Sequence, residues 1–203
     1  GAQMKRPPVV VGISGASGSV YGVRLVKALI ESGSDVMVIL SDAARGVLTH
    51  EMGVDPEADF IEFLVDYGIN PEDGTRIEVL SQNQMASEPA SGSFVHSGMA
   101  VCPCSMKSLS AIASGFADNL LTRSADVALK EKRPLILVPR ETPFNLIHLK
   151  NMEQVTLAGG VILPPNPSFY MFPKTIEELV DTVVARILDH LGVDHELMSR
   201  WGA

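Results

Sequence analysis

Short, largely apolar runs recur along this chain, and helical patterns lie between them. The runs cover Val9–Ser14, Asp35–Leu40, Ile77–Leu80, Met99–Cys102, Pro134–Val138 and Val161–Leu163. Strands buried on both faces of a parallel sheet contain continuous apolar runs, whereas half-exposed strands alternate apolar and polar residues. Because strands and helices alternate, we expect an α/β fold with a doubly wound, mostly parallel sheet and helices on both faces. A ligand of such a sheet is expected at the carboxyl ends of its strands.

The helical patterns have recognisable starts and stops. The predicted helices run from Tyr21 to Gly33, from a cap at Ser41 through Glu51, over residues 54–67, from a cap at Ser105 through Ile112 to Gly115, from Leu121 to Glu131, from Thr142–Pro143 to about Gly159–Gly160, and from a capping box at Thr175–Glu178 through Leu191. Residues 81–97 are rich in Ser, Ala and Pro and are too long for a routine connection, so we expect a functional or mobile loop there.

The length of the chain predicts one domain. It has 203 residues, against a prior of roughly 150 residues per domain. There is no linker and no internal repeat, so residues 4–203 are expected to form a single domain. Gly1–Gln3 precede Met4 and are interpreted as a cloning remnant.

Composition narrows the classes of function. Sixteen basic against 24 acidic residues give a formal charge of −8, which argues against nucleic acid as a partner. No apolar run approaches the roughly 18 residues of a membrane span. Cys102 and Cys104 fit neither a zinc half-site nor a disulfide framework and are interpreted as core residues in a reducing, cytoplasmic compartment. The histidines show no paired spacing and there is no D-D-x-x-D cluster, so no metal site is expected.

A glycine-rich turn follows the first predicted strand. Gly12–Gly18 (GISGASG) ends that strand and opens a helix, where free N–H groups and the helix dipole favour an anion or a polar heterocycle. The turn does not have the G-x-G-x-x-G pattern, and a dinucleotide would need Asp42 to bind its ribose. A mononucleotide is therefore favoured. The alternative is a glycine turn that serves only close packing of the helix on the strand.

Two further segments suggest a phosphate site. Ser105–Ser108 (SMKS) place hydroxyls and an ammonium at a second helix start, although an ordinary serine cap with a solvated lysine gives the same pattern. Five of the 16 basic residues lie between Arg123 and Arg140. Lys132 and Arg133 are interpreted as a solvated surface, whereas Lys130 is a candidate to face a phosphate together with Arg123.

Two carboxylates stand at unusual positions. Arg140 and Glu141 directly follow the predicted strand 134–138, at the edge of the sheet where functional residues gather, and we interpret them as functional. Glu51 shares a helix side with Val47 and Leu48. A carboxylate there needs a partner or a function.

Taken together, these motifs resemble the UbiX-type flavin prenyltransferases. The resemblance covers the chain from Val10 to Trp201. Its most specific segments are GISGASGSVYG (12–22), PASGSF (89–94), CPCSMKSLSAIASG (102–115), LLTRSADVALKEKRPLILVPRETP (120–143) and PSFY with the proline after it (167–173). The resemblance implies a Rossmann-like, flavodoxin-related fold and a homododecamer with active sites between subunits. It also implies that a dimethylallyl group from dimethylallyl phosphate is joined to reduced FMN at N5 and C6, giving prenylated FMN for a UbiD-type decarboxylase.

The resemblance also implies roles for single residues. The FMN-binding positions are Gly15, Ala16, Ser17, Ser41, Ser105, Met106, Lys107, Ser108 and Arg123. The positions that would meet the prenyl phosphate are Lys130, Arg140, Glu141, Tyr170 and Arg186. The implied catalytic set is Ser17, Glu51, Lys130, Glu141 and Tyr170. Ser108 stands where many members have threonine, which keeps the hydroxyl.

The implied mechanism is displacement at an allylic carbon with monophosphate leaving, in which cations stabilise the charge on the leaving oxygens. Two other functions are open on the sequence. One is an FMN-dependent cysteine decarboxylase, for which a P-A-S-A-N-T run would be expected where Pro103–Ser108 stand. The other is a flavin carrier without chemistry, which would not need Lys130, Arg140, Glu141, Tyr170 and Arg186 together.

Overall fold

A computed structural model describes residues 5–71 and 74–198. The strands are β1 Val9–Ile13, β2 Val36–Leu40, β3 Ile77–Ser81, β4 Met99–Cys104, β5 Leu135–Pro139 and β6 Val161–Ile162. The helices are α1 Ser19–Glu31, α2 Asp42–Met52, α3 Phe60–Asp66, α4 Met106–Ser114, α5 Leu120–Lys130, α6 Leu146–Leu157 and α7 Ile176–Leu191, with a short 3-10 helix at Glu88–Ala90. Residues 1–3, which were interpreted as a cloning remnant, and Trp201, the last residue of the resemblance, lie outside the described residues.

Within the described residues the strands form one sheet in the order β3-β2-β1-β4-β5-β6, and every pairing is parallel. This is the strand order of the Rossmann group. The expected doubly wound α/β fold is therefore confirmed. The order in which strands are added to the sheet reverses between β1 and β4. At such a switch point the loops after the two strands diverge and leave a crevice.

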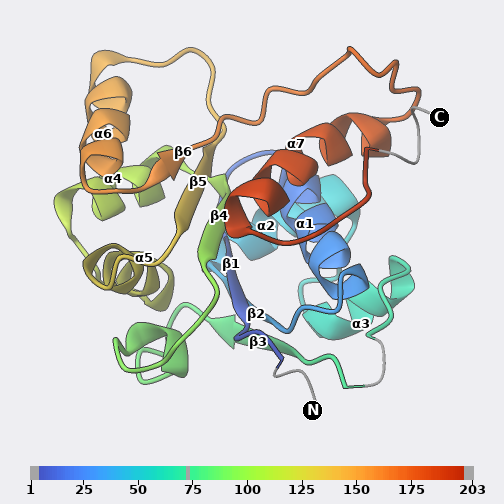
Figure 1. Ribbon diagram of the computed structural model, residues 1–203, viewed down its shortest axis with the longest axis horizontal. Coiled ribbons are helices and arrows are strands. Elements are labelled where there is room, and N and C mark those ends of the chain that lie inside the picture. The colour runs from blue at the N-terminus through green and yellow to red at the C-terminus, as the bar shows by residue number, and fades with distance from the viewer. Residues whose placement is uncertain (1–4, 72–73, 199–203) are drawn as a thin grey trace.

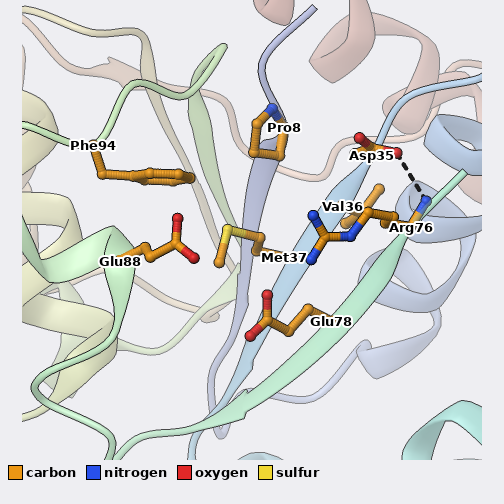
Figure 2. A pocket seen from close by; sticks show the side chains of 8 residues that line it. All are labelled: Pro8, Asp35, Val36, Met37, Arg76, Glu78, Glu88 and Phe94. Carbon is orange, nitrogen blue, oxygen red and sulfur yellow. Dashed lines mark hydrogen bonds between the residues drawn. The ribbon is translucent and has the colours of Figure 1, made fainter. Parts of the chain in front are cut away.

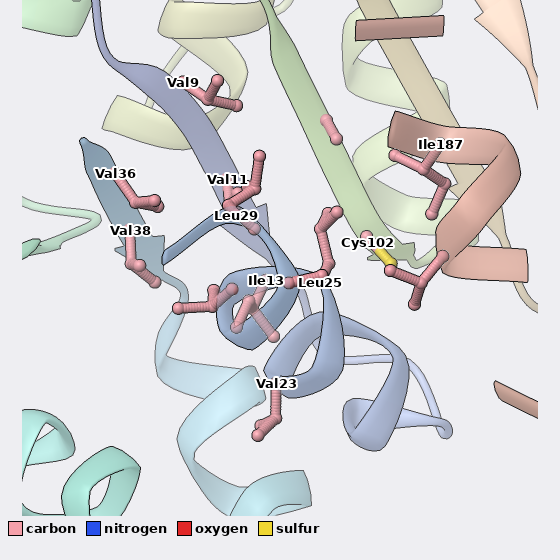
Figure 3. Packing of buried hydrophobic residues seen from close by; sticks show 14 of the residues in the cluster. Val9, Val11, Ile13, Val23, Leu25, Leu29, Val36, Val38, Cys102 and Ile187 are labelled. Carbon is pink, nitrogen blue, oxygen red and sulfur yellow. The ribbon is translucent and has the colours of Figure 1, made fainter. Parts of the chain in front are cut away.

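Helices cover both faces of the sheet (Figure 1). On one face α1 and α7 pack against β1, β2 and β4, and Val11, Leu25 and Ile187 belong to this core. Figure 3 shows how Val11 of β1 and Leu25 and Leu29 of α1 approach one another. The other face packs against α4, α5 and α6. Burial on both faces is the reason that the strands read as continuous apolar runs.

Most element boundaries match the sequence prediction, but two helix starts were predicted wrongly. The helix expected over 54–67 begins at Phe60, because the side chain of Asp59 accepts a hydrogen bond from the N–H of Ile61. The helix expected from Thr142–Pro143 begins at Leu146. There Asn145 forms a capping box with His148, a start signal that is stronger than a nearby proline.

The predicted capping box of the last helix is only half formed. The hydroxyl of Thr175 accepts a hydrogen bond from the N–H of Glu178 at 3.1 Å. The carboxylate of Glu178, however, accepts from the N–H of Lys174, one residue before the cap. The helix starts where expected, and the second bond of the box is shifted by one residue.

Candidate functional site

A cleft of about 920 Å³ opens at the carboxyl ends of the central strands. Five residues predicted to bind FMN line it: Gly15, Ser41, Ser105, Lys107 and Ser108. They come from the loops after β1, β2 and β4, which are far apart in the sequence and meet because parallel strands end at the same edge. This is the location that the alternation of strands and helices predicts.

The N-terminus of α4 faces this cleft. Ser105 caps the helix, and its Oγ accepts a hydrogen bond from the N–H of Ser108 at 3.1 Å. The exposed side chain of Lys107 lies in the first turn. Backbone N–H groups of a first turn, the helix dipole and an ammonium together form a site for an anion.

The N-terminus of α1 already has an anion. Its cap residue Gly18 has φ +94° and no side chain, and the carboxylate of Glu51 from α2 takes that role. Glu51 accepts hydrogen bonds from Ser17 Oγ at 2.6 Å, from the N–H of Gly18 at 3.0 Å, and from the N–H and Oγ of Ser19 at 2.9 and 2.8 Å. The carboxylate that needed a partner on this side of its helix therefore has four hydrogen-bond donors.

These contacts also set the ionisation of Glu51. Burial raises its pKa, but the hydrogen bonds from Ser17, Ser19 and Gly18 outweigh burial, so the pKa of Glu51 lies below its ordinary value. Glu51 is thus a carboxylate at neutral pH, and its short bond to the Ser17 hydroxyl gives that hydroxyl a proton acceptor.

Arg140 lies beside the same turn. Its N–H donates to the carbonyl oxygen of Cys104 at 3.2 Å, and a Cβ placed on Gly18 would be 3.9 Å from Arg140 Cγ. The neighbouring Tyr21 has a pKa raised by burial, and the charge of Arg140 acts in the opposite direction. Glu141 is exposed, and its Oε1 accepts the N–H of Thr142 at 3.0 Å. The structure thus brings Arg140 next to Gly18, whose N–H binds Glu51.

Three other predicted FMN-binding residues have different surroundings. Ala16 is buried in the turn after β1, and Met106 packs against the core on the α4 side of the sheet. Arg123 lies one residue after Thr122, which lines the cleft, and its guanidinium is 3.6 Å from the carboxylate of Asp126.

The remaining predicted phosphate ligands do not meet Arg140 within the chain. Lys130 ends α5 at the opposite end of β5, where it pairs with Glu131 and approaches Gly92. Tyr170 is 86% exposed on the segment between β6 and α7. Arg186 is exposed on α7 and pairs with Asp189 at 2.8 Å. Among the described residues, the contacts of these three side chains include none with Arg140.

Sequence reasoning missed several residues that line the cleft, among them Gln82, Asn83, Asn119 and Thr122. Asp42, which was considered only as a ribose ligand of a dinucleotide, lines the cleft as well. Gln82 joins two helix starts: its Oε1 accepts the N–H of Asp42 at 2.9 Å and its carbonyl oxygen accepts the N–H of Leu120 at 2.7 Å. The loop 81–97 was predicted to be functional, and its unusual length was the signal for Gln82 and Asn83. Nothing in the sequence distinguished them from their neighbours.

A second, smaller cavity of about 120 Å³ lies at the amino ends of β1, β2 and β3. Figure 2 shows Phe94, Glu88 and Glu78 around it, with the guanidinium of Arg76 directed inward. None of the predicted site residues lines this cavity. The cleft at the carboxyl edge is therefore the candidate site.

Cys102 and Cys104 are buried free thiols. Burial raises the pKa of both; the charge of Cys104 also raises that of Cys102, and the pKa of Cys104 reaches about 12. Both thiols belong to the core, and a protonated buried thiol is a poor nucleophile.

In the part of the chain that the structure describes, no cluster of three or more His, Cys, Asp or Glu could hold a metal ion. No helix in that part is long and apolar enough to cross a membrane.

The fold and the cleft define a class of protein that comparison confirms. The family model described as Flavoprotein matches residues 2–188 of the chain. The flavin prenyltransferase UbiX of Pseudomonas aeruginosa is 46% identical over 198 residues, which cover 96% of this chain and 93% of that protein. The UbiX of Methanothermobacter thermautotrophicus is 42% identical, covering 95% and 94%. Within the flavoprotein class, the chain belongs to the UbiX flavin prenyltransferase family.

Solved structures agree with this assignment. The crystal structure of AnUbiX (PadA1), described as a complex with FMN and dimethylallyl pyrophosphate, superposes with a TM-score of 0.85 at 41% identity and covers 98% of this chain and 99% of that one. A dodecameric FMN-dependent UbiX-like decarboxylase from Escherichia coli O157:H7 superposes with a TM-score of 0.82 at 39% identity, covering 93% and 96%. The cysteine decarboxylase TvaF, at 18% identity and a TM-score of 0.62, shares the fold alone.

Proposed function

We propose that this protein joins the dimethylallyl group of dimethylallyl phosphate to N5 and C6 of reduced FMN, giving prenylated FMN. The observation that carries the proposal is the cleft at the carboxyl edge, which the anion site of α4 and Gly15 line. The turn that continues from Gly15 holds the Ser17–Glu51 pair, and Arg140 lies beside Gly18 of this turn. Membership of the UbiX family and the FMN and dimethylallyl pyrophosphate named for a 41% identical structure support the two substrates.

The cleft suits FMN in size and charge. Its volume of about 920 Å³ is at the upper end of the range of about 300–1,000 Å³ that small-molecule sites span. Glu51 already occupies the N-terminus of α1, whereas the N-terminus of α4, with Ser105, Lys107 and Ser108, lines the cleft and has a cation in its first turn. These residues would bind the FMN phosphate, and the turn Gly15–Ser17 would contact the rest of the flavin. Reduced flavin supplies the nucleophilic nitrogen and ring carbon for the reaction.

The chain contributes proton and charge control to the allylic displacement. Arg140 would stabilise negative charge on the leaving phosphate. The carboxylate of Glu51 accepts the Ser17 hydroxyl hydrogen bond, so the pair can take a proton removed from the flavin. Glu141, which is exposed just after β5, would exchange a proton with the phosphate or the allylic carbon.

A second copy of the chain would complete the phosphate site. Lys130 lies at the opposite end of β5 from Arg140, and the side chains of Lys130, Tyr170 and Arg186 are all exposed in one chain. The exposed aromatic side chains of Phe169 and Phe172 flank Tyr170 and suit a protein contact. A homododecamer, as named for the E. coli protein, is the assembly that we propose. A UbiD-type decarboxylase would receive the product, and the buried free thiols suit a cytoplasmic location.

The direct test is an anaerobic incubation of the protein with reduced FMN and dimethylallyl phosphate, followed by mass spectrometry of the flavin. We expect the flavin mass to increase by one C5H8 unit. In a parallel incubation with oxidised FMN, we expect the flavin mass to stay unchanged. Flavin that binds but keeps its mass would identify a carrier instead. Release of carbon dioxide from a cysteine-containing substrate, without prenylation, would identify a decarboxylase.

A further inference from the structure

The two strands at the switch point lose their regular pairing just before the cleft. The register between β1 and β4 runs from Val10↔Met99 to Gly12↔Val101. Beyond it, β4 also shifts its register against β5 between Val101 and Cys104. Pro103 has no N–H group with which to continue a ladder. The loops that line the cleft therefore start where the regular ladder between β1 and β4 ends.

The side chain of Ser14 fills this gap. Its Oγ donates to the carbonyl oxygen of Pro103 at 2.8 Å and accepts the N–H of Ser105 at 2.7 Å. The backbone N–H of Ser14 also donates a hydrogen bond to the Pro103 carbonyl oxygen, at 3.3 Å. Ser14 is 1% exposed. The hydroxyl is thus engaged both as donor and as acceptor, and it has no contact with the open cleft through which it could react.

Ser14 connects the two parts of the cleft that we assign to flavin. On one side its carbonyl oxygen accepts the N–H of Ala16 at 2.9 Å, which shapes the turn Gly15–Ser17. On the other side its hydroxyl holds Ser105, the cap of α4. We propose that Ser14 is a positioning residue that fixes the phosphate-binding start of α4 relative to the turn after β1. This inference rests on the proposed function, because it assumes that FMN spans both parts.

The proposal predicts a selective loss of phosphate recognition. Ser14→Ala leaves the Ser105 N–H without its acceptor and frees the start of α4 to move. FMN binding should weaken by about tenfold or more, the size expected when a buried hydrogen bond is lost. Riboflavin has no phosphate, so its affinity should stay nearly the same. The preference for FMN over riboflavin is the quantity to measure, since general destabilisation lowers both affinities alike.

The experiment titrates reduced FMN and reduced riboflavin into wild-type protein, Ser14→Ala and Ser14→Cys. The cysteine variant keeps nearly the same volume with a poor hydrogen-bonding group, and it replaces the alanine variant if that one does not fold. Ser124→Ala is the matched control, because Ser124 is a buried serine whose hydroxyl has no partner among the described residues. We expect the control to keep the wild-type preference for FMN.

Two results would overturn the proposal, and they are distinguishable. If Ser14→Ala and Ser14→Cys keep the wild-type preference for FMN, or lose both flavins equally, Ser14 is only a structural residue. If the wild-type protein binds neither flavin, the proposed function fails, and the role of Ser14 fails with it.

Discussion

The carboxylate of Glu141 shows what can be read from a single residue. Its place directly after a buried strand and Arg140 indicated a function, and in the structure it is exposed just after β5, where its Oε1 accepts the N–H of Thr142. The positions of Glu51 and Arg140 were informative in the same way. Ser14 and Gln82 were not, because a hydroxyl or amide that bridges two distant loops looks like any other polar residue until the chain is folded.

Glu141→Gln should therefore separate chemistry from binding. Glutamine keeps the size of the side chain and removes a titratable proton carrier, so we expect the rate to fall by roughly 10²–10⁴ with FMN binding nearly intact. Rates come from the product mass over time, and FMN binding from a parallel titration. Glu153→Gln, on the exposed side of α6, is the control. A wild-type rate in Glu141→Gln would make the carboxylate merely structural.

His96 provides a prediction about pH. It is 5% exposed, its Nδ1 accepts the N–H of Gly98 at 3.0 Å, and burial, together with the charge of Arg133, lowers its pKa to about 4. An unfolded histidine has a pKa of about 6.5. Between these values the unfolded chain binds a proton that the native protein does not, so stability falls as pH falls from about 6.5 to 4, by up to about 1.4 kcal/mol per pH unit.

His96→Asn removes this dependence and keeps an acceptor for Gly98. Urea unfolding at pH 7 and pH 4.5, at one protein concentration, should show wild type losing about 2–3 kcal/mol more than the variant. An equal loss in both proteins would show that His96 is protonated as readily in the native state as in the unfolded chain.

Helix packing depends on close contacts between backbone segments, and the sequence gives little direct evidence of these contacts. The four central strands, β1, β2, β4 and β5, were predictable because burial on both faces makes each one a largely apolar run. The starts of α3 and α6 were not, because a single cap, at Asp59 or Asn145, decides them. Glycines inside helices carry a similar ambiguity, since each one either weakens its helix or permits a contact.

Gly22 and Gly46 test this distinction as a pair. A Cβ on Gly22 of α1 would lie 2.5 Å from the carbonyl oxygen of Cys102 in β4, whereas one on Gly46 of α2 meets nothing within 4 Å. We expect Gly22→Ala to destabilise the protein by about 1–3 kcal/mol. Gly46→Ala should stabilise it by about 0.5–1 kcal/mol through helix propensity. Thermal unfolding of both variants measures this, and a stabilising Gly22→Ala would contradict the close packing of α1 on β4.

Within one chain, Lys130 and Arg140 lie far apart, although we assign both to a single prenyl phosphate. Lys130 and Arg140 flank β5, whose five residues alone span roughly 13 Å. The sequence could not show this, since the two residues were grouped by proximity along the chain and by resemblance. If both contact the same prenyl phosphate, they must come from different copies, and the active site exists only in the assembly.

Complementation between inactive variants tests this claim most directly. Lys130→Ala and Arg140→Ala, carrying different tags, are co-expressed, and mixed oligomers are isolated through both tags. Some sites in these oligomers then combine a wild-type Lys130 from one chain with a wild-type Arg140 from another. The double variant co-expressed with itself is the control that has no intact site. Prenylated FMN formed by the mixed oligomers, but by neither single variant, is the predicted result; mixed oligomers as inactive as the separate variants would contradict a site shared between copies.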